Sequence, residues 1–261
     1  MADFVAAGDA RIAFDAVGSG PALVLMHGAE ASRQMFGALV PLLAPHFTVI
    51  AYDQRDCGET ESPERAATLA ELAADARALI EGLGFAKAHV FGSSFGGRVA
   101  QTLAAAHPNA VDRLVLGSTW PLPRSFAELM PEGAARIAEL RSQLPVSAEA
   151  LARMFFPDAF LAERPELRQF FAAVRPESAR SRRRAAAVDD APAIDLASIE
   201  ARTLLVAGEF DRVVPMRVTL AMESLLRDAR HVVLPGVGHA TSLQAPAALA
   251  DHLVRFLKET P

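Results

Sequence analysis

The sequence has a single cysteine, no excess of basic over acidic residues and no long apolar run, and each of these absences argues against a class of protein. Cys57 is the single cysteine among 261 residues, so no internal disulfide can form, which fits a reducing compartment. A formal net charge of -5 supplies no basic surface for nucleic acid or for an anionic membrane. No apolar run approaches the roughly 18 residues that a membrane span needs. We therefore expect a cytoplasmic protein that binds neither nucleic acid nor a membrane.

Two further absences concern targeting and metals. The first ten residues, MADFVAAGDA, lack the basic region and the sustained apolar region of a signal peptide. The His, Cys and Asp residues show no clustered metal-ligand spacing. We therefore expect no metal site. What the chain does have is apolar residues, which make up 51% of it and are enough for a sizeable core.

Short apolar runs alternate with helical patterns along most of the chain. The region from Thr68 to Leu83 has apolar residues at helical spacing, and Thr68 with Glu71 forms a capping box at its start. The apolar runs are unbroken rather than alternating, as expected for parallel strands covered on both faces. These runs are Ala22–Met26, Phe47–Ala51, His89–Phe91, Arg113–Leu116, Thr203–Ala207 and His231–Leu234. The pattern predicts an α/β protein with a doubly wound, mostly parallel sheet.

Residues 121–196 interrupt this alternation. The segment contains no convincing strand, and its many prolines predict several short helices. We expect a helical cap inserted between two strands of a core formed by residues 1–120 and 197–261. Because ligands of open α/β sheets bind beyond the carboxyl ends of the strands, the cap is interpreted as a lid rather than a plain surface elaboration. The basic run Arg182–Arg184 is interpreted as a solvated helix face.

The stretch Gly92-Ser-Ser-Phe-Gly96 fits the pattern G-x-S-x-G with Ser94 at its centre. An apolar run precedes it and a helical pattern follows, as a sharp strand-to-helix turn requires. Glycines flank such a turn because side chains would collide there with the neighbouring strand and helix. The turn exposes the Ser94 hydroxyl at a helix N-terminus, where developing negative charge is favoured.

A serine hydroxyl needs a base and an oriented acid before it can act as a nucleophile. His239 is the preferred base because it lies on the glycine-rich loop that follows the run ending at Leu234. Asp211, just after the Thr203–Ala207 run, is the preferred acid, and Glu209 is the reserve.

Five segments together resemble the α/β-hydrolase superfamily over nearly the whole chain. They are the oxyanion-loop motif His27-Gly-Ala29, the turn Tyr52–Gly58, the serine turn Gly92–Gly96, the acid turn Gly208–Asp211 and the histidine loop Gly236–His239. Ser94, Asp211 and His239 also follow one another in the nucleophile–acid–base order of that superfamily. The resemblance implies catalysis of acyl transfer, with Ser94 as nucleophile and no cofactor. It also implies an oxyanion hole made by the backbone N–H groups of Ala29 and Phe95.

The sequence departs from small esterases and enol-lactonases of this superfamily at several positions. Glu30 stands where a second glycine is usual. It is interpreted as solvent-facing or paired with a nearby arginine such as Arg33, or else as a polar contact to substrate or a further acid/base group. Phe36 replaces a tryptophan and is expected to form a pocket wall. Trp120 lies at the start of the cap, and both a role in lining the pocket and a role in packing the core remain open for it. Asp56 replaces a turn glycine, and Asp tolerates the left-handed conformation.

The best general likeness is to esterases and 3-oxoadipate enol-lactonase-like proteins. We therefore expect a serine hydrolase acting on small-molecule carboxylic esters or lactones. Three alternatives remain: a C–C bond hydrolase of ring-cleavage products, a cofactor-free perhydrolase or haloperoxidase, and a ligand-binding receptor that keeps the triad. A haloalkane dehalogenase is disfavoured because that chemistry uses an aspartate where Ser94 stands.

Overall fold

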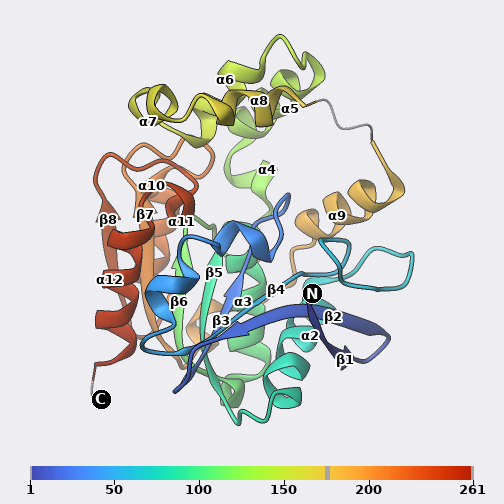
Figure 1. Ribbon diagram of the computed structural model, residues 1–261, viewed down its shortest axis with the longest axis vertical. Helices are drawn as coiled ribbons and strands as arrows, with labels where there is room; N and C mark the ends of the chain where they lie inside the picture. Colours follow the sequence, from blue (N-terminus) through green and yellow to red (C-terminus); the bar gives the residue numbers. More distant parts are fainter. Residues whose placement is uncertain (1, 174–176, 260–261) are drawn as a thin grey trace.

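An eight-stranded sheet forms the centre of the protein in the computed structural model, which describes residues 2–173 and 177–259 (Figure 1). The spatial order of the strands is β1-β2-β4-β3-β5-β6-β7-β8. β1 and β2 pair in antiparallel fashion with their neighbours, and all pairs from β4 to β8 are parallel. The strands are β1 Asp3–Ala7, β2 Ala10–Val17, β3 Ala22–Met26, β4 Thr48–Tyr52, β5 Ala88–Ser93, β6 Val111–Gly117, β7 Arg202–Gly208 and β8 Ala229–Leu234. The mostly parallel α/β sheet predicted from the sequence is confirmed.

All six predicted strands exist, each with bounds within two residues of the apolar run at either end. β3 and β5 are buried at every position, which explains their unbroken apolar sequences. The antiparallel strands β1 and β2 were not predicted from the sequence. β2 exposes the side chains at its carboxyl end, so it lacks the continuous apolar run by which the other strands were found.

Helices cover both faces of the sheet. α2 (Leu69–Gly82) and α3 (Phe95–Ala106) pack on one face, in a large apolar cluster with Val24 and Val90. α1 (Val40–Leu43) and α12 (Pro246–Leu257) contact each other on the opposite face, in a second cluster with Leu23 and Phe91. Shorter elements complete the core: α10 Met216–Leu220, α11 Thr241–Gln244 and the 3-10 helices η1 Arg33–Phe36, η2 Pro108–Ala110, η3 Leu196–Ser198 and η4 Ala221–Ser224.

The start of α2 is capped as the sequence predicts. The Thr68 hydroxyl accepts a hydrogen bond from the Glu71 N–H at 3.2 Å, and a Glu71 carboxylate oxygen accepts from the Thr68 N–H at 2.9 Å. Arg65 pairs with the same carboxylate at 2.6 Å, and these contacts lower the pKa of Glu71 to about 2. The cap therefore stays ionised at neutral pH and complements the positive end of the helix.

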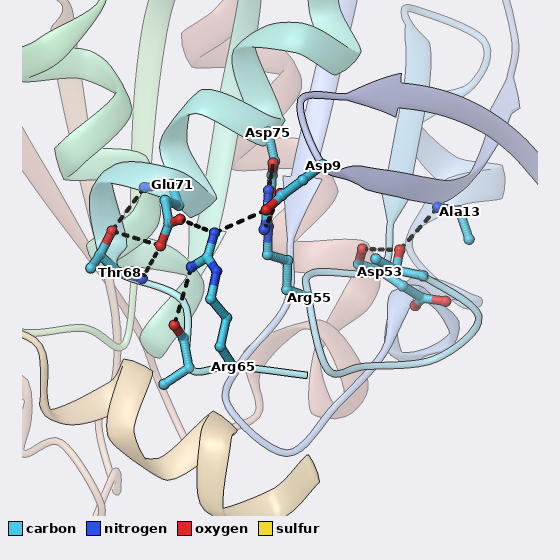
Figure 2. Close-up of polar contacts among 10 residues, drawn as sticks. Asp9, Ala13, Asp53, Arg55, Arg65, Thr68, Glu71 and Asp75 are labelled. Atoms are coloured by element: carbon cyan, nitrogen blue, oxygen red, sulfur yellow. Dashed lines mark hydrogen bonds and ion pairs between the residues drawn. The ribbon is translucent and has the colours of Figure 1, made fainter. Parts of the chain in front are cut away.

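An ion-pair cluster joins α2 to the β1–β2 turn (Figure 2). Arg55 lies between Asp75 of α2, at 2.6 Å, and Asp9 of the turn, at 2.7 Å. Arg65 reaches both Asp9 and Glu71. Every charged side chain of this cluster has an opposite partner, so the cluster fixes the antiparallel edge of the sheet to the helical layer on that face.

Six α-helices occupy the span between β6 and β7, and no strand is formed by the described residues of this span. They are α4 Phe126–Leu129, α5 Pro131–Ser142, α6 Ala148–Phe155, α7 Asp158–Glu163, α8 Glu166–Ala172 and α9 Ala179–Asp189. α5 to α8 form a layer beyond one end of the sheet (Figure 1), and α9 lies against the turn that follows β4. Residues 174–176 of the expected cap lie outside the described residues. Throughout the described chain, no helix combines the length and apolarity needed to cross a membrane.

Candidate active site

The carboxyl ends of four parallel strands bring the candidate residues to one edge of the sheet. β5 ends directly before Ser94, β7 three residues before Asp211, and β8 five residues before His239. β3 ends directly before the loop that begins at His27. Because these strands run parallel, loops far apart in sequence converge at this edge, which the layer of α5 to α8 covers.

Ser94 lies in a strained turn between β5 and α3. Its backbone has φ 53° and ψ -122°, a conformation that side-chain-bearing residues rarely adopt. A Cβ on Gly92 would collide with the Gly96 carbonyl, and a Cβ on Gly96 would collide with the Met26 carbonyl. The turn is held by a hydrogen bond from the Thr119 hydroxyl to the Ser94 carbonyl at 2.7 Å. The glycines thus allow the close backbone packing that presents the Ser94 side chain at the edge.

Ser94, His239 and Asp211 form one hydrogen-bonded chain. The distance from His239 Nε2 to Ser94 Oγ is 3.1 Å, and the distance from His239 Nδ1 to Asp211 Oδ2 is 2.8 Å. His239 and Asp211 are buried, whereas Ser94 is partly exposed. The arrangement allows the imidazole to take a proton from the hydroxyl while the carboxylate fixes its other nitrogen.

Backbone N–H groups orient the Asp211 carboxylate. Its Oδ1 accepts from the N–H groups of Val213 at 2.9 Å and of Val214 at 2.8 Å, which leaves Oδ2 for His239. Since a carboxylate only accepts, the His239 Nδ1 carries a proton, and in the neutral imidazole Nε2 is then free to accept one from Ser94. Glu209, the reserve acid, points elsewhere and accepts from the Gly236 N–H at 2.8 Å.

His27 organises the loop that faces Ser94. Its Nδ1 lies 2.7 Å from the Gly28 carbonyl oxygen and must therefore donate, while its Nε2 accepts from the Gln54 N–H at 3.1 Å. Burial lowers the pKa of His27 to about 3, so the ring is neutral at physiological pH, as this bonding requires. The Gln54 side chain donates to the His27 carbonyl at 2.6 Å. The loop is thus held by a buried network in which each of these donors meets an acceptor.

The Ala29 and Phe95 N–H groups donate no hydrogen bond to any other described residue. Phe95 is the first residue of α3, where an N–H has no partner within the helix. A Cβ on Gly28 would lie 3.6 Å from the Ser94 Cβ, so the loop passes close to Ser94. Two unpaired amides near Ser94 are what an oxyanion hole requires.

The three expected pocket residues lie in different surroundings. Glu30 is exposed and pairs with Arg141 of α5 at 2.8 Å, whereas Arg33 instead pairs with Asp53 and two other acidic side chains. Phe36 is fully buried and packs edge-on against Phe91 at 6.1 Å between ring centres.

This placement corrects the expectation for Phe36, which lies in the core cluster on the α12 face of the sheet and not at a pocket wall. Trp120 is 2% exposed, contacts Phe126 edge-on at 5.3 Å between ring centres and has its ring 5.1 Å from the Arg98 guanidinium carbon. Of the two alternatives left open for Trp120, this environment corresponds to core packing.

Two residues of the span between β6 and β7 contact the site and were not predicted from the sequence. The Phe155 carbonyl, at the end of α6, accepts from the His239 N–H at 2.8 Å, and its ring meets the imidazole edge-on at 5.6 Å. Arg184 of α9 donates to the Ala29 carbonyl at 2.9 Å. Arg184 is 6% exposed, so the interpretation of Arg182–Arg184 as a solvated face is wrong at this position.

The burial of Arg184 arises because α9 docks on the turn after β4. Arg183 pairs there with Asp56 at 2.7 Å, and Asp56 has the left-handed φ of 59° that its position required. Arg182 alone of the basic run is well exposed. The sequence did contain a local signal that Arg184 is not an ordinary surface arginine. No acidic residue lies three or four positions away from it, where one could pair with it along the helix.

Comparisons with known proteins agree with this architecture. A family model for the alpha/beta hydrolase fold matches residues 21–246. The fluoroacetate dehalogenase of a Burkholderia species is 35% identical over 47% of this chain and 42% of that protein. The 2-hydroxymuconate semialdehyde hydrolase of Pseudomonas sp. strain CF600 is 27% identical over 93% of this chain and 88% of the relative. The crystal structure of a hydrolase from Pseudomonas aeruginosa PA01 is 31% identical, with a TM-score of 0.80 over 99% of this chain and 98% of that one.

The coverage differs between these relatives. The chain spans only 40–43% of the length of the first curated relatives that it matches. The semialdehyde hydrolase and the Pseudomonas aeruginosa hydrolase are instead matched over 88% and 98% of their length.

Proposed function

The chain belongs to the alpha/beta-hydrolase family, and we propose that it is a serine hydrolase that cleaves small-molecule carboxylic esters or lactones. The observation that carries the proposal is the chain of contacts from Ser94 through His239 to Asp211, at 3.1 and 2.8 Å. The adjacent unpaired amides of Ala29 and Phe95 support acyl transfer, in which an oxyanion develops beside the nucleophile.

The proposed reaction has two halves. His239 takes the Ser94 proton while Oγ forms a bond to the substrate carbonyl carbon, and the carbonyl oxygen becomes an oxyanion bound by the two amides. The oxyanion then collapses, the C–O bond to the leaving group breaks, and His239 donates its proton to the departing alkoxide. In the second half His239 deprotonates water, which attacks the acyl-enzyme and releases the acid together with free Ser94.

The fluoroacetate dehalogenase relative does not favour dehalogenation here. The nucleophile position holds Ser94, and its hydroxyl is paired with an imidazole base. Displacement of a halide by this hydroxyl would give an alkyl ether, which has no carbonyl that water could attack. The similarity to that protein is therefore attributed to the shared fold.

A panel of p-nitrophenyl esters and lactones tests the proposal, with a fluorophosphonate probe as a marker of serine reactivity. We expect turnover of at least one ester or lactone and covalent labelling of the wild type. Ser94→Ala should abolish both while its circular dichroism spectrum stays unchanged. Full activity in Ser94→Ala would refute the assignment of the nucleophile.

Hydrolysis of a C–C bond next to a carbonyl is the second candidate. It is favoured by the match to the 2-hydroxymuconate semialdehyde hydrolase over 93% of this chain. The same triad serves both reactions, since each passes through attack on a carbonyl carbon. A vinylogous diketone substrate separates them: turnover of this compound without turnover of any ester or lactone would replace the first proposal by the second.

A further inference from the structure

We propose that Arg184 is a positioning residue that sets the geometry of the oxyanion hole from α9. The inference rests on the proposed function and names a residue on which that site depends. Arg184 does not contact Ser94, His239 or Asp211 in the described structure. It acts through the loop that carries Ala29 and through the ring of Phe95.

Three contacts place the Arg184 guanidinium against both halves of the oxyanion hole. Its Nε donates to the Ala29 carbonyl at 2.9 Å, and its Nη2 donates to the Gln54 side-chain oxygen at 3.0 Å. Its central carbon lies 4.5 Å from the centre of the Phe95 ring, within range of a cation–π contact. One side chain therefore contacts the two residues whose N–H groups would bind the oxyanion.

The hydrogen bond from Arg184 to the Ala29 carbonyl fixes the second of the two peptide groups that flank Ala29. The Gly28 carbonyl and the Ala29 N–H belong to one trans peptide group and point in opposite directions. His27 binds that carbonyl and so directs the Ala29 N–H. The next peptide group begins with the Ala29 carbonyl, which Arg184 binds. With both flanking peptide planes held, the two backbone dihedrals of Ala29 are determined.

Gln54 links Arg184 to the His27 side of the same loop. Its side-chain oxygen accepts from Arg184, and its side-chain nitrogen donates to the His27 carbonyl. The carbonyls of His27, Gly28 and Ala29 are therefore all bound, by Gln54, His27 and Arg184 respectively. Removing Arg184 would free one end of this loop and leave the Gln54 oxygen unpaired.

Stability alone does not account for this arginine. Its two hydrogen-bond acceptors are neutral oxygens, no carboxylate among the described residues pairs with it, and its buried Nη1 has no partner there. Burial accordingly lowers the pKa of Arg184. Burying a charge without an ionic partner costs free energy, and two hydrogen bonds to neutral oxygens offset that cost only in part. A residue retained at such a cost is expected to serve the site.

The experiment compares Arg184→Met with Arg182→Met as the matched control. Arg182 lies on the same helix, is exposed and, among the described residues, pairs with Glu177 at 3.7 Å. For each variant we would measure kcat and KM on the best ester, the inhibition constant of a matching trifluoromethyl ketone, the rate of fluorophosphonate labelling and the thermal midpoint. The ketone forms an oxyanion with the serine and so reports on transition-state binding.

For Arg184→Met we expect kcat to fall roughly 10- to 100-fold, because a misplaced donor approaches the loss seen when one is removed. KM should change less than about threefold, the inhibition constant should rise by the same factor as kcat/KM falls, and the thermal midpoint should stay above the assay temperature, because relief of the buried charge partly offsets the two lost hydrogen bonds. Arg184→Lys keeps a charge without the planar fork and should stay at least about tenfold below the wild type. Arg182→Met should match the wild type.

Gln54→Met alone gives a second test if Arg184→Met does not fold, and the double variant gives a further test if it does. Since Gln54 and Arg184 hold the same loop, Gln54→Met alone should lower kcat in the same direction, and the loss in the double variant should be smaller than the product of the single losses. Three results would overturn the inference: unchanged kcat and inhibitor binding in the folded Arg184→Met variant, a raised KM with unchanged kcat, which indicates direct substrate binding, or fully multiplicative losses.

Failure of the inference can be told apart from failure of the proposed function. If the wild type turns over no ester or lactone, the proposed function fails. The labelling rate of Ser94 by the fluorophosphonate still depends on the oxyanion hole and still compares Arg184→Met with Arg182→Met. An unchanged labelling rate in Arg184→Met would then reject the inference by itself.

Discussion

Replacing Asp211 by asparagine tests whether its carboxylate sets the proton position on His239. In the structure Oδ1 is bound by two backbone N–H groups and Oδ2 by the His239 Nδ1. The new amide side chain must keep its oxygen at the backbone donors, because an NH2 group cannot accept from them. The NH2 group therefore faces Nδ1 as a donor, and the imidazole must move its proton to Nε2.

The expected loss follows from this change of tautomer. A ring protonated at Nε2 cannot accept the Ser94 proton, although Ser94, the oxyanion hole and the backbone are unchanged. In a serine protease the corresponding substitution lowers kcat about 10⁴-fold. We expect a fall of roughly 10³- to 10⁴-fold, which corresponds to about 4–5.5 kcal/mol of transition-state stabilisation at about 1.36 kcal/mol for each decade.

The assay is kcat for p-nitrophenyl ester hydrolysis, with thermal unfolding as the check on folding. Glu209→Gln is the matched control, since Glu209 lies two residues away on the same turn and contacts Gly236 rather than His239. We expect the control to retain kcat within about threefold, because the triad is untouched. A folded Asp211→Asn variant with kcat within about tenfold of the wild type would show that this carboxylate does not orient the base.

Two further predictions concern the histidine loop and the oxyanion loop. Gly238→Ala would place a Cβ against the Phe155 carbonyl, so we expect a loss of about 1–3 kcal/mol in urea unfolding together with lower kcat. Gly133→Ala on α5, where a Cβ meets only Met130 at 3.8 Å, is its control, and equal effects of the two substitutions would contradict this expectation. His27 has a pKa of about 3 in the folded state, below its unfolded value of about 6.5, so it contributes stability above pH 6.5 that is lost as pH falls toward 3. The free energy of unfolding of the wild type should therefore fall between about pH 6 and 4. The fall should be steeper than in His27→Asn by up to about 1.4 kcal/mol per pH unit. Identical pH slopes in the two proteins would rule this out.

The parallel sheet and the loops that carry Ser94, Asp211 and His239 could be predicted because their signals are local. An unbroken apolar run indicates a strand buried on both faces, and a parallel sheet sends every strand end to the same edge. Knowing that three polar loops follow three such runs is then enough to bring them together. The capping box of Thr68 and Glu71 is local in the same sense, and the structure contains it.

The contacts of the helices between β6 and β7 could not be predicted in this way. Glu30 pairs with Arg141, and Arg184 with the Ala29 carbonyl, across more than 100 residues of sequence. Neither pair has a periodic pattern, because α5 and α9 are positioned by packing on the core rather than by hydrogen bonds of the sheet. Phe36 was misplaced for a related reason: an aromatic residue after a loop can face either side of the sheet, and here it packs against Phe91 on the α12 face.

The helices between β6 and β7 are not independent of the chemistry at the sheet edge. They bind His239 through the Phe155 carbonyl and the loop that carries Ala29 through Arg184. A backbone hydrogen bond contributes about 1 kcal/mol, and one from a charged donor about 1.5–3 kcal/mol, so moving these helices away would forfeit both and release His239 and Ala29 together. A lid that only excluded water would need neither contact. Gly238 lets the α6 backbone approach the histidine loop. The single methyl group added by Gly238→Ala should therefore separate α6 from His239 and lower activity, although Ser94, Asp211 and His239 themselves are unchanged.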